Sequence, residues 1–133
     1  MKTRNTAVYV VEDSPIMRAL LIELIETAGA TVVGHADTAS AAIADIAALH
    51  PDAVTIDLSL KAGSGFDVLE AIAINEVNPP LRIVLTNYTT DAHREAAHEL
   101  DADYFFDKAM QIREMLFALS HFLFRTLILV PMG

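Results

Sequence analysis

The chain has 133 residues, of which 53% are hydrophobic, and it carries a formal net charge of −9 at pH 7. This length and composition are typical of one compact domain and argue against a disordered chain. The negative charge argues against a nucleic-acid-binding surface, and the absence of cysteine excludes disulfides, thiolate catalysis and cysteine-ligated zinc.

Targeting signals are not expected in this sequence. Basic residues stand near the start, but the apolar run that follows them is too short for a signal peptide. No uncharged apolar run is long enough to cross a bilayer. We therefore expect a cytoplasmic protein that has no membrane segment.

Strand-like and helix-like segments alternate along the chain. A short apolar run at 7–11 is followed by Ser14 and Pro15, an N-cap residue and a favoured first helical residue. Apolar positions then recur at helical spacing until Gly29. The later segments follow in the same order, with strands expected at 31–33, 53–56, 81–85 and 103–106, and helices at 39–49, after 63–65, at 90–100 and from 110 to about 124.

Five strands, each followed by a helix, predict a doubly wound parallel sheet with helices on both faces. In such sheets ligands bind at the carboxyl ends of the strands, near the change in strand order. No linker, low-complexity stretch or second domain is recognisable. We therefore expect one α/β domain over residues 1–124, followed by an apolar tail at 125–133.

Polar side chains stand at the carboxyl ends of the predicted strands. Glu12 and Asp13 follow the first strand, and Asp57 follows the third. Thr86 follows the fourth strand and Lys108 comes just after the fifth. An acidic side chain at the end of a buried strand is costly unless it has a use there. The five residues together therefore predict one cation and phosphate site.

The chemistry of such a site follows from its charges. Three converging carboxylates either have raised pKa values or are neutralised by a divalent cation, and oxygen ligands shared with a phosphate suit Mg²⁺. Asp57 can act both as a metal ligand and as a nucleophile that forms an acyl phosphate. Lys108 and the Thr86 hydroxyl would contact other phosphoryl oxygens.

Each of these residues also has an ordinary structural interpretation when it is taken alone. Glu12 and Asp13 could be part of a solvated loop, and Asp57 could cap a turn. Thr86 could be a simple strand-end residue, and Lys108 a surface charge. Their common placement at strand ends is what favours a shared site.

Five short segments carry a family resemblance. They are residues 10–14 (VVEDS), 56–60 (IDLSL), 63–69 (GSGFDVL), 85–86 (LT) and 102–108 (ADYFFDK). With these segments in register, the sequence resembles the receiver domains of two-component response regulators over nearly its whole length. The resemblance implies a flavodoxin-like sheet with strand order 2-1-3-4-5.

The resemblance also implies roles for individual residues. Asp57 would accept a phosphoryl group from a histidine kinase or a phosphotransfer protein, and the domain would catalyse its own phosphorylation and dephosphorylation. Glu12, Asp13, Asp57 and the backbone carbonyl of Ser59 would bind Mg²⁺. Thr86 and Lys108 would contact the phosphoryl group.

A conformational switch is a further implication of the resemblance. Phe105 matches the aromatic switch position of the family, and Thr86 would move toward the phosphate and open space for the ring. The alternative interpretation of Phe105 is a static core residue. Ser59 and Tyr88 stand at positions that tune dephosphorylation in the family.

Other functions remain open at this level. Two enzyme or cofactor-binding functions are disfavoured. A dehalogenase-type phosphatase would need a second acidic residue where Ser59 stands, and a dinucleotide-binding module would need a glycine-rich turn after the first strand, which this sequence lacks. A docking or dimerisation module with a receiver fold, independent of phosphorylation, is the stronger alternative. Apolar residues at Phe117, Phe124 and 126–130 exceed what one helix face must bury. This surplus predicts a homodimer through the last helix and the tail; alternatively, the tail folds back on its own domain or is disordered. The chain could be a stand-alone regulator, a phosphate shuttle or a part of a longer protein.

Overall fold

The computed structural model describes the backbone of residues 5–129 and the side chains of residues 5–123. Five parallel strands form one sheet in the order β2-β1-β3-β4-β5, which confirms the predicted fold class and strand order. The strands are β1 (Ala7–Val11), β2 (Thr31–Ala36), β3 (Ala53–Ile56), β4 (Leu81–Thr86) and β5 (Tyr104–Asp107).

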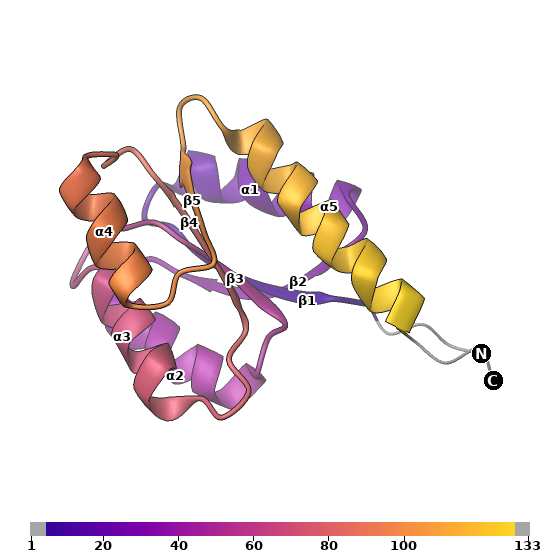
Figure 1. Cartoon of the computed structure of the whole chain (residues 1–133), viewed down its shortest axis with the longest axis horizontal. Coiled ribbons are helices and arrows are strands. Elements are labelled where there is room, and N and C mark those ends of the chain that lie inside the picture. The colour runs from indigo at the N-terminus through magenta and orange to yellow at the C-terminus, as the bar shows by residue number, and fades with distance from the viewer. Residues whose placement is uncertain (1–4, 130–133) are drawn as a thin grey trace.

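Helices cover both faces of the sheet. Helices α1 and α5 lie on one face, and α2, α3 and α4 lie on the other (Figure 1). The helices are α1 (Pro15–Thr27), α2 (Ala39–Leu49), α3 (Gly65–Asn75), α4 (Asp91–Glu99) and α5 (Ile112–Leu129). Among the described residues, no helix combines the length and the apolarity that a membrane span requires.

The core has two halves, one on each side of the sheet. Alternate residues of β1 point to opposite sides, so that Val8 and Val10 pack in the half under α1 and α5, while Tyr9 and Val11 pack in the half under α2, α3 and α4. A strand that is buried on both faces reads as a continuous apolar run. This explains why β1 and β3 were recognisable in the sequence.

Two elements end later than the sequence indicated. Strand β2 continues to Ala36 because Gly34 and His35 pair with β1 after a shift in register. A Cβ at Gly34 would lie 2.9 Å from the Tyr9 ring, so this position needs glycine for steric reasons. Helix α5 continues to Leu129 where an apolar tail was expected after Phe124. The last part of that tail, 130–133, lies outside the described residues.

Thr55 on β3 is 1% exposed, and its buried hydroxyl has no hydrogen-bond partner among the residues that the structure describes. We expect Thr55→Val to raise the free energy of unfolding by about 1 kcal/mol, because valine has the same shape and removes an unsatisfied polar group. Urea unfolding measures this change. Thr31→Val, at an exposed position of β2, is the matched control, and a destabilised Thr55→Val would contradict the prediction.

Candidate functional site

Backbone hydrogen bonds continue the sheet past its strands and bring the acidic residues together. The amide of Glu12 donates to the carbonyl of Ala36 at 3.0 Å, and the amide of Asp57 donates to the carbonyl of Val11 at 3.0 Å. The residues that follow β1 and β3 are therefore held side by side at the carboxyl edge of the sheet. This edge is where α/β sheets bind ligands.

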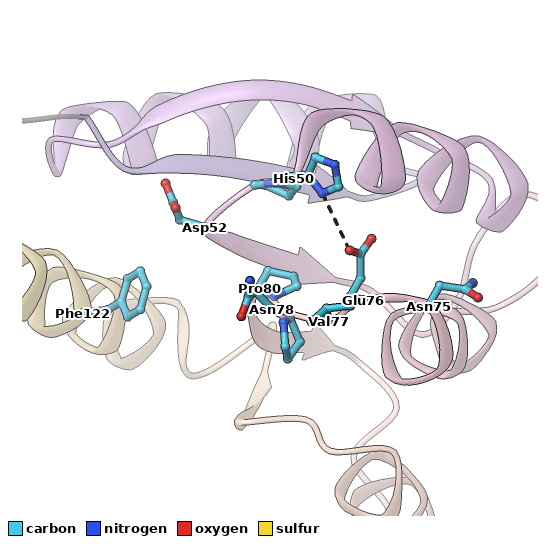
Figure 2. A pocket seen from close by; sticks show the side chains of 10 residues that line it. His50, Asp52, Asn75, Glu76, Val77, Asn78, Pro80 and Phe122 are labelled. Carbon is cyan, nitrogen blue, oxygen red and sulfur yellow. Dashed lines mark ion pairs between the residues drawn. The ribbon is translucent and has the colours of Figure 1, made fainter.

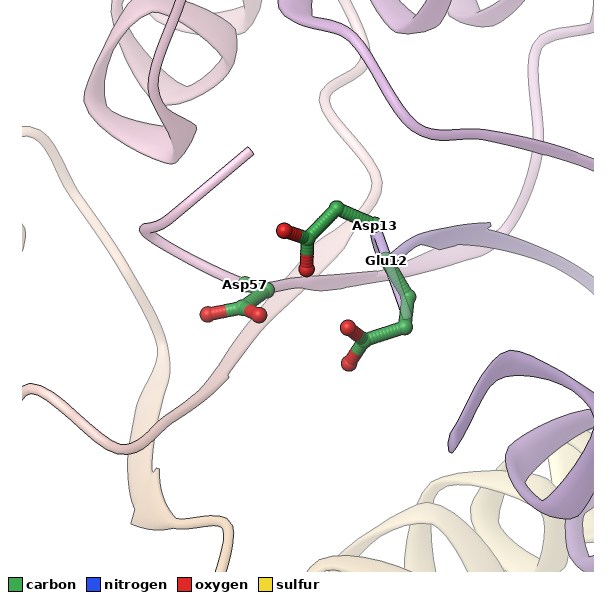
Figure 3. A group of neighbouring side chains, drawn as sticks. All are labelled: Glu12, Asp13 and Asp57. Carbon is green, nitrogen blue, oxygen red and sulfur yellow. The ribbon is translucent and has the colours of Figure 1, made fainter. Parts of the chain in front are cut away.

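Three carboxylates meet at this edge, as the sequence predicted. Oxygen atoms of Glu12, Asp13 and Asp57 lie within 4.8 Å of one another, at the ends of β1 and β3 (Figure 3). Glu12 is 1% exposed and Asp57 is 4% exposed, whereas Asp13 is half-buried. Such burial makes the mutual repulsion of the carboxylates stronger.

Lys108 provides the opposite charge from the end of β5. Its Nζ atom donates a hydrogen bond to Asp57 Oδ2 at 2.6 Å and lies 2.8 Å from Glu12 Oε1, although only 7% of the lysine is exposed. One ammonium therefore faces two buried carboxylates, and the half-buried Asp13 adds a third negative charge. The cluster is left with an excess of negative charge.

Burial and pairing shift the pKa values of this cluster in a consistent way. Burial raises the pKa of Glu12, and the contacts with Lys108 and the Ser14 amide only partly oppose this shift. Burial by itself would lower the pKa of Lys108, but the hydrogen bonds and charges of Asp57 and Glu12 outweigh it, so that the pKa of Lys108 is raised. Lys108 consequently stays protonated at neutral pH.

Backbone amides fix the orientation of the carboxylates. The Ser59 amide donates to Asp57 Oδ1 at 3.2 Å, and the Ser14 amide donates to Glu12 Oε2 at 3.1 Å. A Cβ at Gly65, the first residue of α3, would collide with the carbonyl oxygen of Asp57. The loop after β3 can therefore pass this close to α3 only because Gly65 has no side chain.

The donor set fits a hard divalent cation. All its side-chain donors are carboxylate oxygens, which suit Mg²⁺ better than a softer metal. The ion pair with Lys108 leaves the buried Glu12 Oε1 without a well-aligned hydrogen bond, so that an acceptor remains for a cation. Glu12, Asp13 and Asp57 would hold the ion, and the carbonyl of Ser59 stays a predicted fourth ligand.

A cavity of about 300 Å³ opens above Asp57. Its lining residues are Asp13, Ser14, Asp57, Ser59, Asn87, Tyr88 and Lys108. This volume gives a small anion direct access to the Asp57 carboxylate and to the Lys108 ammonium.

The two expected switch residues, Thr86 and Phe105, are not among the residues that line this cavity. Thr86, the last residue of β4, is fully buried, and its hydroxyl accepts a hydrogen bond from the Tyr88 amide at 3.2 Å. Phe105 on β5 is half-buried, and the guanidinium of Arg94 lies 4.7 Å from the centre of its ring. The structure thus places Thr86 and Phe105 near the site without direct contact to Asp57 oxygens.

Sequence reasoning missed two supporting residues. Ser14 was assigned only as the N-cap of α1, which it is, since its hydroxyl accepts from the Met17 amide at 3.3 Å. Its own amide also orients Glu12. Arg18, one turn into α1, donates to the carbonyl of Glu12 at 3.2 Å, a contact that its place outside the apolar stripe could not reveal.

Another hollow, at the opposite edge of the sheet, has a volume of about 560 Å³. It lies between the turn before β3, the loop before β4 and Phe122 of α5 (Figure 2). His50 and Glu76 form an ion pair across part of it at 3.7 Å. Over the described residues, however, Glu12, Asp13 and Asp57 form the one cluster of three potential metal-ligating side chains. We therefore place the chemistry at the carboxyl edge.

The sheet order 2-1-3-4-5, with three carboxylates and a lysine at its carboxyl edge, defines the receiver class of α/β domains. The chain belongs to the response regulator receiver domain family of two-component systems, whose sequence model matches residues 8–120. This confirms the family expected from the sequence motifs.

Known relatives agree with this membership. A protein-glutamate methylesterase/protein-glutamine glutaminase of Hahella chejuensis is 32% identical over 95 residues, which cover 71% of this chain and 27% of that protein. A Burkholderia thailandensis protein of the same name is 37% identical over 95 residues, which cover 71% of this chain and 26% of that protein. The chain thus spans less than a third of the length of these curated relatives. The response regulator domain of Thermotoga maritima CheB superposes with a TM-score of 0.77 at 25% identity, covering 96% of this chain and 100% of that one.

Proposed function

We propose that Asp57 accepts a phosphoryl group from a histidine kinase or a phosphotransfer protein in a Mg²⁺-dependent reaction. The observation that carries this proposal is the 2.6 Å contact between Lys108 Nζ and Asp57 Oδ2, beside two further carboxylates and at the floor of an open cavity. A lone structural ion pair would not need Glu12 and Asp13 next to it. A phosphoryl-transfer site needs both the acidic ligands and the ammonium.

The residues have distinct roles in this reaction. An oxygen of Asp57 forms a bond to phosphorus as the bond between phosphorus and the donor breaks. Lys108 exchanges a carboxylate partner for a phosphoryl oxygen, and it enters the reaction as a cation because Asp57 and Glu12 raise its pKa. Glu12, Asp13 and Asp57 would hold Mg²⁺, which would supply positive charge next to the phosphoryl group. A cytoplasmic location belongs to the same proposal.

The test is phosphorylation of the chain by a small donor. We expect incubation with acetyl phosphate and Mg²⁺ to give a single phosphoryl adduct by intact mass spectrometry, and excess EDTA to suppress it. No adduct from acetyl phosphate, phosphoimidazole or a phosphorylated histidine kinase would instead favour the alternative function, phosphorylation-independent docking. Phe117 on α5 is 76% exposed and is compatible with that docking or with a homodimer through α5.

We further propose that Thr86 and Phe105 transmit the phosphorylated state to the surface. A phosphoryl group adds charge and acceptor oxygens, which would draw the Thr86 hydroxyl away from the Tyr88 amide. Movement of the Phe105 ring into the vacated space would have to break its contact with Arg94, which lies 4.7 Å from the ring centre. Arg94 is therefore expected to hold the ring in its resting position.

Replacing Arg94 tests this switch. We expect Arg94→Ala to bind beryllofluoride, a phosphoryl mimic, about two- to fivefold more tightly in the presence of Mg²⁺, since an exposed cation–π contact of about 0.5–1 kcal/mol no longer opposes the ring movement. Calorimetric titration measures the affinity, and NMR reports on the Phe105 ring. Arg113→Ala, at an exposed position of α5, is the control. Phe105 resonances that stay unchanged on beryllofluoride binding would show that the ring is static.

A further inference from the structure

A second hollow adjoins the acidic cavity and has aromatic walls. Its volume is about 260 Å³, and its lining residues are Leu58, Ser59, Ser64, Phe66, Tyr88 and His93. Ser59 and Tyr88 line both hollows, so the aromatic hollow begins where the acidic cavity ends. We call this second hollow the ring pocket.

Three rings from three elements form the wall of the ring pocket. His93 of α4 is nearly parallel to Phe66 of α3, with ring centres 6.2 Å apart and an interplanar angle of 15°. Tyr88, in the loop between β4 and α4, lies 5.7 Å from His93 at an angle of 43°. The Thr90 hydroxyl contacts His93 Nδ1 and thereby fixes the imidazole. The wall is therefore ordered before any ligand arrives.

The core buries these three rings only in part. Tyr88 is 50% exposed, and His93 and Phe66 are half-buried. Tyr88 is also anchored to the reaction site, because its amide donates to the Thr86 hydroxyl. A flat aromatic group that entered from the acidic cavity would find apolar ring surface next to Asp57.

The charges around the two hollows favour a particular leaving group. Among the described residues, no lysine or arginine lines the ring pocket, and Lys108 is the one lysine or arginine that lines the acidic cavity, where it is paired with Asp57 and Glu12. A leaving group that departs as an anion, such as acetate, finds no lysine or arginine side chain in the ring pocket. A leaving group that departs as a neutral ring needs no cationic side chain and gains contact with the aromatic wall.

We propose that the ring pocket is a leaving-group subsite that favours phosphodonors carrying an imidazole ring, with Phe66 and His93 as specificity-determining residues. This inference rests on the proposed function of Asp57. An oxygen of Asp57 forms a bond to phosphorus while the bond between phosphorus and the ring nitrogen breaks. The bonding electron pair stays on that nitrogen, and a ring that is protonated on its other nitrogen leaves as neutral imidazole.

The experiment compares two small donors on the full chain. Rates of adduct formation with Mg²⁺ are measured by intact mass for phosphoimidazole and for acetyl phosphate, and their ratio is the readout. Phe66→Leu and His93→Leu remove a ring from the pocket while they keep an apolar side chain. Phe117→Leu removes an exposed ring from α5, far from the pocket along the chain, and is the matched control.

We expect the ratio of the phosphoimidazole rate to the acetyl phosphate rate to fall about two- to tenfold in each pocket variant, as the loss of one ring contact implies. In the two pocket variants the acetyl phosphate rate should stay unchanged. In the control, Phe117→Leu, the ratio of the two rates should stay unchanged. An unchanged ratio in both pocket variants, or an equal fall of both rates, would overturn the subsite and leave the proposed function standing. No adduct from either donor with the unsubstituted chain would overturn both.

Discussion

Asp57→Asn is expected to abolish the phosphoryl adduct while the domain stays folded. The amide nitrogen of asparagine cannot attack phosphorus as a carboxylate does, so the adduct should fall below detection with acetyl phosphate and Mg²⁺. The amide oxygen can still accept the hydrogen bond that the Ser59 amide donates to Asp57 Oδ1. The Lys108 ammonium keeps its ion pair with Glu12 at 2.8 Å.

The charge balance supports a stable Asp57→Asn variant. Three carboxylates share one ammonium in the wild-type cluster, and the substitution removes one of the repelling charges. We therefore expect the urea midpoint in the absence of Mg²⁺ to stay close to that of the wild type. Asp37→Asn is the matched control, because Asp37 directly follows β2 at the same edge of the sheet. An adduct that persists in Asp57→Asn would assign phosphorylation to another residue.

The carboxylate and lysine positions were predictable because they depend on backbone topology alone. Parallel strands of one sheet end at a common edge, and β1 and β3 are neighbours, so the residues directly after them lie close together. The residue after β5 lies at the same edge, from which the long side chain of Lys108 reaches the carboxylates. Glu12, Asp13, Asp57 and Lys108 meet this condition, and the structure brings them together. No side-chain packing had to be known in advance.

The features that escaped the sequence depend on tertiary packing. Gly34 and His35 extend β2 by pairing with β1 after a shift in register, and the Tyr9 ring leaves no room for a Cβ at Gly34. Local propensity disfavours glycine in a strand, so the sequence did not indicate this extension. The continuation of α5 to Leu129 was hidden because an apolar run has no helical stripe that could distinguish a helix from a tail.

Contacts between helix side chains and loops were equally inaccessible from the sequence. Arg94 reaches Phe105 on the neighbouring strand, and His93, the residue before it, contacts Phe66 and Tyr88. The angular position of α4 on the sheet decides these contacts. No spacing rule in the sequence encodes that angle, so the ring pocket appeared only in three dimensions.

Lys108→Met is expected to lower the free energy of unfolding by about 3–5 kcal/mol in the absence of divalent cations, the usual cost of removing one partner from a buried ion pair. Methionine keeps an apolar stem of similar length, so packing around the site is largely preserved. Asp57 and Glu12, which are 4% and 1% exposed, would lose their common counter-charge. Urea unfolding with EDTA measures the loss.

Two conditions should restore part of this loss, and each has a physical reason. Added Mg²⁺ supplies positive charge to the same carboxylates and stabilises the folded state that binds it. Lower pH should act in the same direction, because burial already raises the pKa of Glu12 above its unfolded value. The folded variant then binds more protons than the unfolded chain, and its stability rises as the pH falls through the folded pKa.

The control for this prediction is Lys61→Met, which removes an exposed lysine and should change the free energy of unfolding by less than about 0.5 kcal/mol.

If Lys108→Met were as stable as the wild type in EDTA, the carboxylates would have to be protonated or solvated without the lysine. The negative cluster would then have no need of a cation, and the argument for Mg²⁺ at Glu12, Asp13 and Asp57 would fail. If Mg²⁺ restored stability to Lys108→Met but not to a variant that also carries Asp13→Asn, the ion would be assigned to this carboxylate cluster.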